Sequence, residues 1–326
     1  MPKVIPISKS QFETSAKLGL QEFSKKRNTI LIVRNTGGLG DILMMRMIFE
    51  DFKRVMPDVK IVFACPTAYH DAVKDHPFID KILDSTKVDE SEYIINYNVT
   101  TACGDYEYSI APRSDKHRSD IWAEHCGLQL EHHDMHISIP NDVLSKCRHQ
   151  LEENSNGKPI VLFSPISAMP SKDLDIKQRT EVLDGLLKRN YYVVGFHNKI
   201  IPELNCNQIQ AKNFVEFLGF INAADVIVSV DTAALHAAGG CKKTCLGIFS
   251  WADGYVYTKY YPKCHVVQKH RLTDSNWACG PCYLWSRCIK QAVGPRKPCI
   301  SELTSDLILK EFDVMITKFS NYSLLS

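Results

Sequence analysis

The stretch Thr29-Ile-Leu-Ile-Val-Arg-Asn-Thr-Gly-Gly-Leu-Gly-Asp41 decides how the first half of the chain folds. Its first five residues form a short β-branched run, which is typical of a buried parallel strand. A glycine-rich turn follows, then residues 41–55 with apolar side chains at helical spacing, then a second apolar run at residues 59–64. Strand, helix and strand with short joints predict a βαβ unit of a parallel sheet.

The same alternation continues outward from this unit. In the first half it predicts weaker strands at residues 81–83 and 93–96 and a helix at 118–126. In the second half it predicts strands at 159–163, 191–196, 224–230 and 244–249, and helices at 175–189, 232–238 and 304–319. Between the halves, a helix that starts near Asn141 leads into a polar linker ending at Lys158.

This pattern predicts two doubly wound, Rossmann-like α/β domains, residues 1–157 and residues 158–326. In open α/β sheets, ligands bind outside the carboxyl ends of the strands, so we expect a cleft between the carboxyl ends of the two sheets. A length of 326 residues also favours two domains over one.

Composition restricts the cellular setting. Residues 1–27 are polar and charged and lack the apolar segment of a signal peptide. No apolar run approaches the roughly 20 residues that span a bilayer. Because the sequence shows no export signal, its twelve cysteines are expected to be reduced thiols in the cytoplasm.

The glycine-rich turn is the first candidate site. Glycines at 37, 38 and 40 allow positive φ angles and a close approach of backbone to a ligand, and the helix that follows directs free N–H groups toward that ligand. The spacing matches neither the dinucleotide-binding G-x-G-x-x-G nor the Walker A loop. A tight turn in which Asp41 caps the helix is the structural alternative.

The second candidate site is Ser229-Val-Asp-Thr-Ala-Ala-Leu-His-Ala-Ala-Gly-Gly240. A buried strand ends at Val230, and Asp231 and Thr232 stand at the start of the next helix, where a capping oxygen or a backbone amide can meet a phosphate. His236 follows Thr232 by four residues, so both lie on one helix face. A capped helix with a core histidine is the alternative for this segment taken alone.

Taken together, Gly37-Gly-Leu-Gly-Asp-Ile-Leu43 and Val230-Asp-Thr-Ala-Ala-Leu-His-Ala-Ala238 resemble the heptosyltransferase family, glycosyltransferase family 9. The resemblance implies the GT-B fold and an inverting transfer of a sugar from a nucleotide diphosphate sugar. It implies that Asp41 is the general base on the acceptor hydroxyl, a role open to a carboxylate within hydrogen-bond reach. The family usually has glycine after the Asp-Thr pair, where this chain has Ala233.

The resemblance also implies which residues bind the donor. Hydroxyl residues and a lysine in the loop after the strand at 159–163 would hold the departing diphosphate, whose developing charge a cation stabilises. A solvated polar loop is the alternative there. The expected donor-binding residues are Gly38, Gly40, Ser164, Ser167, Lys172, Asp231, Thr232, Ala233 and His236.

Four late cysteines have the spacing C-x2-C-x5-C-x10-C, namely Cys279, Cys282, Cys288 and Cys299. Four thiolates can bind a tetrahedral structural zinc, although the second spacing is not that of a standard zinc ribbon. Free thiols, an iron–sulfur site and two disulfides are the alternatives. Any such metal would be structural, and the sugar-transfer chemistry requires no cofactor.

The cysteines lie in a basic segment, residues 259–299, which has eight basic side chains and the single carboxylate of Asp274. Its net charge is +7 in a chain of net charge +2, which suggests an anionic partner. Lys290 and Arg296 are the expected acceptor-binding residues. The leading acceptor is an anionic saccharide of the lipopolysaccharide-core type, which would allow peripheral contact with a membrane.

Two other functions stay open. Tyrosines and tryptophans lie among the basic residues after Trp251, and such rings stack on bases, so a nucleic acid with a modified base is a second acceptor class. The same rings also suit the faces of sugars. A non-catalytic protein that binds nucleotide sugars is the third interpretation.

Overall fold

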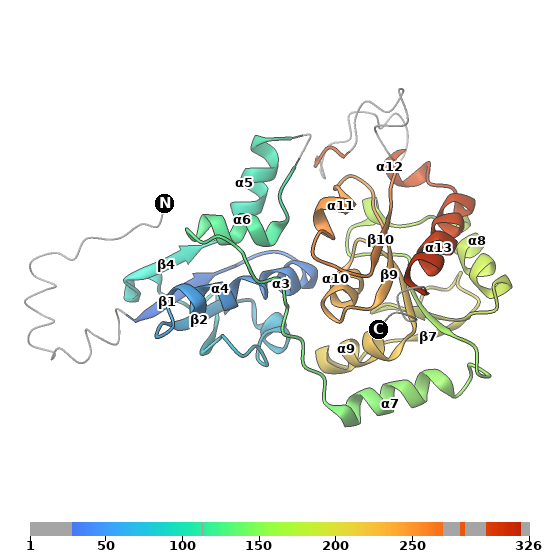
Figure 1. Ribbon diagram of the computed structural model, residues 1–326, viewed down its shortest axis with the longest axis horizontal. Coiled ribbons are helices and arrows are strands. Elements are labelled where there is room, and N and C mark those ends of the chain that lie inside the picture. Colours follow the sequence, from blue (N-terminus) through green and yellow to red (C-terminus); the bar gives the residue numbers. More distant parts are fainter. Residues whose placement is uncertain (1–27, 112–113, 270–280, 284–297, 321–326) are drawn as a thin grey trace, which may run out of the picture. The chain divides into compact units, whose positions relative to one another are not determined.

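A computed structural model describes residues 28–111, 114–269, 281–283 and 298–320. The chain divides into two compact units. Of the described residues, those from 28 to 106 and from 118 to 137 form the N-terminal unit, and those from 107 to 117 and from 138 onward form the C-terminal unit. Each unit contains its own parallel sheet (Figure 1).

The N-terminal unit contains a four-stranded parallel sheet of order β3-β2-β1-β4 within the described residues. Strand β1 lies between β2 and β4, and its residues 30–33 are completely buried. Burial on both faces explains the uninterrupted apolar run in this strand. The strands are β1 (Thr29–Val33), β2 (Lys60–Cys65), β3 (Lys81–Asp84) and β4 (Ile95–Asn98).

The helix expected at residues 41–55 is divided in two. Hydrogen bonds tighten from the i−4 to the i−3 pattern where Arg46 N–H bonds to Leu43 O and Met47 N–H to Met44 O. The fully buried Arg46 side chain then reaches the carbonyl oxygen of Met135, which ties this break to the end of the unit. The helices here are α3 (Leu39–Met45), α4 (Ile48–Val55) and α6 (Arg118–His125), with 3-10 turns η1 (Thr67–Ala72) and η2 (Glu90–Glu92).

The C-terminal unit contains a six-stranded parallel sheet of order β10-β9-β8-β5-β6-β7 within the described residues. Numbered along the unit, this is the 3-2-1-4-5-6 order of dinucleotide-binding folds. Strands β7 and β10 were not predicted; β7 has only three residues, and β10 lies in the segment singled out for its charge and cysteines. The strands are β5 (Ile160–Ser164), β6 (Tyr192–Phe196), β7 (Asn207–Ile209), β8 (Val226–Val230), β9 (Thr244–Ile248) and β10 (Cys264–Val267).

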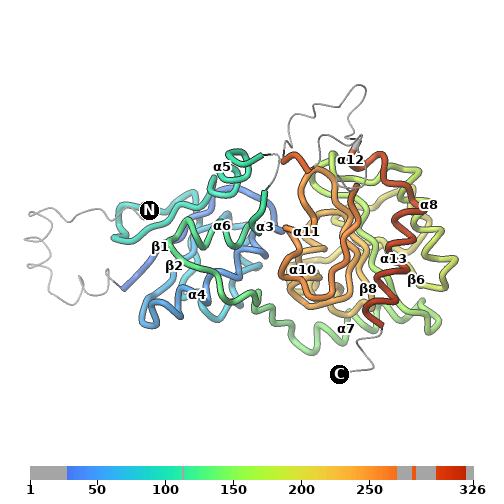
Figure 2. The backbone as a smooth tube through the Cα atoms, turned by 45° about the horizontal axis from the view of Figure 1, so that its top comes forward, coloured from blue at the N-terminus to red at the C-terminus, as the bar shows by residue number. Residues whose placement is uncertain are grey.

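Helices α8 and α13 lie side by side in this unit, as Figures 1 and 2 both show. They pack closely because Gly185 of α8 has no Cβ, which would lie 2.2 Å from a methyl carbon of Leu309. The described helices that belong to this unit are α7 (Asn141–Glu152), α8 (Ile176–Lys188), α9 (Phe214–Ala223), α10 (Ala233–Gly240), α11 (Gly254–Tyr257), α12 (Pro298–Ser301) and α13 (Ser305–Ser320), with the 3-10 turn η3 (Pro170–Lys172). Helix α5 (Ala102–Ser109) begins in the N-terminal unit and ends in this one.

The division between units differs from the expected boundary after residue 157, because α7 belongs to the C-terminal unit. Helix α7 packs against α9, and the Arg148 guanidinium donates to the carbonyl oxygen of Ala223 (2.7 Å) and to Asp225 (3.0 Å). The chain therefore changes unit at residues 137–138, before α7, and residues 107–117 also belong to the C-terminal unit.

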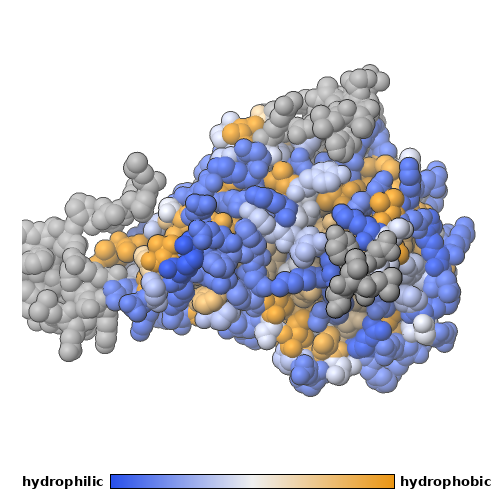
Figure 3. All heavy atoms as spheres, viewed as in Figure 1, coloured by the Kyte–Doolittle hydropathy of each residue, from blue (hydrophilic) through white to orange (hydrophobic). Residues whose placement is uncertain are grey.

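Hydrophilic residues dominate the face shown in Figure 3, and hydrophobic residues occur among them in scattered patches. Large apolar side chains exposed by more than a third include Ile176, Leu187 and Ile200. Scattered exposure of this kind is normal for globular proteins. Among the described helices, none combines the length and the apolar character that crossing a membrane would require.

We predict that Gly219→Ala in α9 destabilises the C-terminal unit. The new Cβ would lie 2.8 Å from Cys147 Sγ and 3.1 Å from Val143 Cγ1, both on α7, and overpacking of this kind costs about 1–3 kcal/mol. Gly104→Ala in α5 is the matched control, because nothing lies within 4 Å of its Cβ. Urea unfolding of both variants measures the difference. Equal stabilities would contradict the close packing of α7 on α9, and Gly219→Ala with Cys147→Ala should recover part of the loss.

Candidate active site

Each sheet has one point at which strand order reverses, and the predicted site residues lie there. The reversal falls between β1 and β4 in the N-terminal unit and between β5 and β8 in the C-terminal unit. Ligands of open α/β folds bind outside the carboxyl ends of the strands at such points. Asp41 is in the loop and helix that follow β1, Lys172 follows β5, and Asp231 follows β8.

In the N-terminal unit, Asp41 is held by two arginines and a backbone amide. Its Oδ1 lies 2.6 Å from Nη1 of Arg118, and its Oδ2 lies 3.1 Å from Nη2 of Arg34. The same Oδ2 accepts the N–H of Gly38 at 3.2 Å. Asp41 is thus the third residue of α3 rather than its capping residue, which is Gly38.

These contacts keep Asp41 ionised. Burial is the largest single influence and opposes ionisation, but the charges of Arg118 and Arg34, with the hydrogen bonds from Arg118 and Gly38, outweigh it. The pKa of Asp41 is therefore held far below its usual range. The carboxylate is deprotonated, as a general base must be. Each cation beside its oxygens, however, lowers its affinity for a proton.

Arg34 reaches Asp41 because residue 37 is glycine. Gly37 has a φ angle of +113°, and a Cβ there would lie 2.3 Å from Arg34 Nη2 and 2.9 Å from Asp41 Oδ2. The guanidinium of Arg34 lies 4.6 Å above the ring of Trp122, which is fully buried. The glycine loop therefore makes room for an ion pair.

In the C-terminal unit, one partly buried lysine and three buried side chains form a connected group. Lys172 Nζ lies 2.6 Å from Asp231 Oδ2, and His236 Nε2 lies 3.2 Å from Asp231 Oδ1. The other ring nitrogen of His236, Nδ1, lies 2.7 Å from the hydroxyl of Tyr261. Both nitrogens of His236 thus contact other side chains, so His236 positions Asp231 in this structure.

Asp231 is ionised for the same reason as Asp41. Burial raises its pKa, but the charge of Lys172 and the hydrogen bond from His236 lower it more, and the pKa lies far below its usual range. Thr232 caps α10, since its Oγ1 accepts the N–H of Ala234 at 3.1 Å. Ala233 is the first residue of α10 and brings its backbone to the same helix start.

The other predicted donor-binding residues are two serines after or at the end of β5 and two glycines of the N-terminal unit. Ser164 ends β5 and donates its hydroxyl to the carbonyl oxygen of Phe196. Ser167 donates to Met169 O (2.8 Å), and its N–H bonds to the carboxylate of Asp173 (2.7 Å). Their hydroxyls thus order the protein here. Gly38 and Gly40 stand at the start of α3, in the other unit from the expected donor site.

From the sequence, no role was assigned to Arg34 and Arg118, and Tyr261 was considered only among the rings that stack on a base or a sugar, whereas Tyr261 is buried against His236. Arg34 had a usable signal, because a charged residue directly after a buried strand lies at the ligand edge of the sheet. Arg118 and Tyr261 had none, since they lie 77 and 25 residues away from their partners.

Several predicted residues lie outside the described part of the chain: Cys279, Cys288, Lys290 and Arg296. Cys282 and Cys299 are described, Cys282 as partly buried and Cys299 as buried. Among the described residues, no group of three or more His, Cys, Asp or Glu side chains is arranged to hold a metal ion. The zinc site and the basic acceptor site stay predictions.

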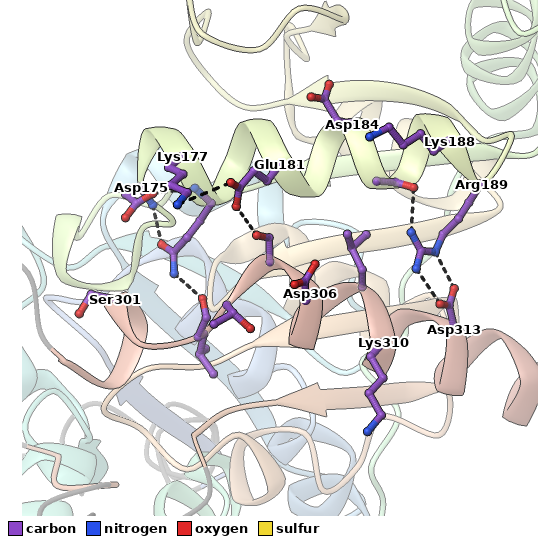
Figure 4. Close-up of a pocket in the computed structure, with 16 residues that line it drawn as sticks. Asp175, Lys177, Glu181, Asp184, Lys188, Arg189, Ser301, Asp306, Lys310 and Asp313 are labelled. Atoms are coloured by element: carbon purple, nitrogen blue, oxygen red, sulfur yellow. Dashed lines mark hydrogen bonds and ion pairs between the residues drawn. The ribbon is translucent and has the colours of Figure 1, made fainter.

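A pocket of about 810 Å³ lies between α8 and α13 in the C-terminal unit (Figure 4). Its lining is mostly charged, and Arg189 makes a two-pronged contact with Asp313 across it, at 2.7 Å for each bond. Gln178 donates to the carbonyl oxygens of Ile300 and Leu303 at its other end. These contacts join the two helices, and none of the predicted site residues lines the pocket.

Two units, each with a parallel sheet and a polar cluster at its switch point, define the GT-B class of fold. The structure is similar to solved structures of heptosyltransferases. The E. coli ADP-heptose lipopolysaccharide heptosyltransferase II shares 13% identity, with 89% of this chain and 99% of that chain covered and a TM-score of 0.64. A family 9 glycosyl transferase from Veillonella parvula shares 12% identity over 89% and 97%, also with a TM-score of 0.64.

The iron-containing dodecameric glycosyltransferase TibC of enterotoxigenic E. coli shares 14% identity over 89% of this chain and 76% of that chain, with a TM-score of 0.67. No protein-family model and no curated protein sequence matches the chain. At these identities the comparisons establish a common fold.

We predict that the contribution of Asp231 to stability is lost at low pH. The folded-state pKa lies below the unfolded value of about 3.9, so the stabilisation is present above that pH and declines as the pH falls below it. Breaking a buried ion pair costs about 3–5 kcal/mol. At pH 7 the melting temperature of Asp231→Asn should therefore be well below that of the wild type. The difference in melting temperature between the two proteins should be constant from pH 7 to about pH 5 and should shrink progressively as the pH falls from about 4 to 2.5. A difference in melting temperature that stays constant over this pH range would contradict an ionised Lys172–Asp231 pair.

Proposed function

We propose that the chain is an inverting glycosyltransferase that uses a nucleotide diphosphate sugar and has Asp41 as its general base. The observation that carries the proposal is the pair of ionised carboxylate clusters, Asp41 after β1 and Asp231 after β8, on a fold similar to that of heptosyltransferases.

The proposed reaction is a single displacement. The acceptor oxygen attacks the anomeric carbon while the bond from that carbon to the diphosphate oxygen breaks, and the configuration inverts. The acceptor proton passes to Asp41, and the nucleoside diphosphate leaves with the bonding electrons. Lys172 and the first N–H groups of α10, next to Thr232, stabilise the charge that develops on the diphosphate.

An ADP-linked heptose is the proposed donor. Related folds were solved with such ligands: the E. coli heptosyltransferase WaaC with ADP and with ADP-2-deoxy-2-fluoro heptose, and TibC with ADP-D-β-D-heptose. The side chains around Lys172 are consistent with the diphosphate part of any of these, because they offer a cation at a helix start.

An anionic saccharide of the lipopolysaccharide-core type is the proposed acceptor. Within the basic segment 259–299, Lys259 and Lys263 are exposed, and Lys269 pairs with Glu302. The two exposed lysines support an anionic partner for this segment. A nucleic acid that bears a modified base is the competing acceptor, and the assay below includes it as single-stranded DNA with such a base.

We predict that Asp41→Asn lowers sugar transfer by roughly 10²–10⁴-fold, the usual contribution of a general base. The measurement is ADP release from ADP-heptose in the presence of lipopolysaccharide core saccharide, or of single-stranded DNA with a modified base in a parallel series. ADP-heptose binding by calorimetry should change little. Asp58→Asn, at an exposed residue, is the control and should keep wild-type rates. Near-normal transfer by Asp41→Asn would exclude the base role.

We predict that Lys172→Met weakens ADP binding by about 10- to 100-fold, because a hydrogen bond to a charged group contributes about 1.5–3 kcal/mol. Lys177→Met is the matched control, since Lys177 is an exposed lysine of the same unit, on α8. Because Lys172→Met leaves Asp231 without its cation, Lys172→Met with Asp231→Asn is measured beside it. Calorimetry that gives the same affinity for all these proteins and the wild type would exclude Lys172 from the donor site.

A further inference from the structure

The loop that follows β9 brings an aromatic ring to Lys172. Strands β8 and β9 are parallel neighbours, so their carboxyl ends lie on one edge of the sheet, where the Asp231 N–H bonds to the carbonyl oxygen of Ile248 at 3.1 Å. Trp251 stands just after β9 and is 4% exposed. Lys172 Nζ lies 5.1 Å from the centroid of the Trp251 ring, within the range of a cation–π interaction. The ammonium of Lys172 therefore contacts both a carboxylate and an indole ring.

The two partners act on this ammonium in different ways. An ammonium has three N–H donors and no acceptor. Asp231 receives one of these donors at 2.6 Å, and within the part of the chain that the structure describes this is the one hydrogen bond that Lys172 Nζ makes. The Trp251 ring attracts the cation through its π face and takes no conventional hydrogen bond from it. The ring thus helps to fix the ammonium while sparing N–H groups for an anion.

Residues far along the chain anchor Trp251. Its carbonyl oxygen accepts the N–H groups of Cys282 at 3.0 Å and of Tyr283 at 3.2 Å. The Tyr283 ring is 1% exposed and packs edge-on against the Trp251 ring, with 6.5 Å between the ring centroids. The Tyr283 hydroxyl accepts the N–H of Asp253 at 3.2 Å. Both the backbone and the ring of Trp251 are therefore in contact with residues 282–283.

Tyr283 makes these contacts with a strained backbone. Its φ angle is +55°, in the left-handed region that bulky residues rarely occupy. Strain of this kind persists only where the surroundings determine the conformation, and it is concentrated at functional sites. The surroundings here are the ring and carbonyl oxygen of Trp251, together with the Tyr257 ring at 6.1 Å. The strained residue thus packs on the ring that contacts Lys172.

We propose that Trp251 is a positioning residue of the donor site, whose ring sets the Lys172 ammonium beside Asp231. Tyr283 fixes that ring. This inference rests on the proposed function, in which Lys172 stabilises the charge that develops on the diphosphate. A cation that is already in place loses less side-chain freedom when the diphosphate binds, so the ring raises affinity. The cysteine-rich basic segment 259–299 then supports the donor site through Tyr283, apart from any effect of its charge.

The first experiment measures ADP binding by calorimetry in the full-length wild type and its variants. Trp251→Leu removes the ring and should weaken binding about fivefold, or about 1 kcal/mol, and Trp251→Phe, which keeps a ring, should lose less. Phe312→Leu is the matched control, because Phe312 is a buried aromatic residue of the same unit that packs on Tyr191 instead. It should keep wild-type affinity. In a Lys172→Met background, Trp251→Leu should have no further effect, because both changes remove the same contact.

The second experiment needs no ligand. In proteins with carbon-13-labelled lysine, the ε-methylene protons of Lys172, assigned with Lys172→Met, should be shifted upfield by the ring current of Trp251. The upfield shift should vanish in Trp251→Leu and persist in Phe312→Leu. It should shrink in Tyr283→Ala, which removes the ring packed against Trp251. An unchanged Lys172 signal in Tyr283→Ala would overturn the part assigned to Tyr283.

The two readouts separate this proposal from the proposed function. A Lys172 signal that Trp251→Leu leaves unchanged overturns the positioning role. An upfield shift that is lost in Trp251→Leu without any loss of ADP affinity also overturns it. If the wild type binds no ADP, the proposed function fails and the donor role of Trp251 falls with it, while the lysine signal still shows whether the ring holds Lys172. If Trp251→Leu does not fold, Trp251→Phe supplies both measurements.

Discussion

The polar architecture of both units depends on keeping a buried carboxylate ionised. Burial alone would favour the protonated forms of Asp41 and Asp231, and the cations beside them reverse that preference. A buried charge without its partner costs several kcal/mol, so the surrounding chain must bring the partner into place. This requirement explains why residue 37 is glycine, which leaves room for the Arg34 guanidinium beside Asp41. It also explains why the Lys172 side chain points from a polar loop toward Asp231.

Parallel sheets satisfy this requirement because they gather strand ends on one edge. Arg34 directly follows β1, and Asp231 directly follows β8, so each charged residue is carried to the edge by a buried apolar strand. At the reversal of strand order, the loops from two neighbouring strands diverge and leave space for polar groups. The Asn35 N–H, after β1, bonds to the Thr100 hydroxyl, after β4, at 3.0 Å across this point.

The sequence predicted what depends on local pattern and missed what depends on distant contacts. Strand β1 and the helix starts at Gly38 and Thr232 follow from apolar runs and capping residues, and the fold class follows from their alternation. The break at Arg46 was missed because its cause, a buried guanidinium bonded to Met135 O, lies 89 residues away. Arg118 and Tyr261 carry no local signal for the same reason, although each contacts a residue that the motifs identified.

The two clusters differ in a way that bears on catalysis. In the second cluster, both ring nitrogens of His236 contact other side chains, and the charge of Lys172 compensates that of Asp231. The side chains of this cluster therefore hold one another in place, an arrangement that suits binding. The first cluster places two cations on one carboxylate, which favours charge stability over basicity. The proton affinity of Asp41 as held here is therefore low, and of the two cations that lower it Arg118 has the more exposed side chain, 19% against 5% for Arg34.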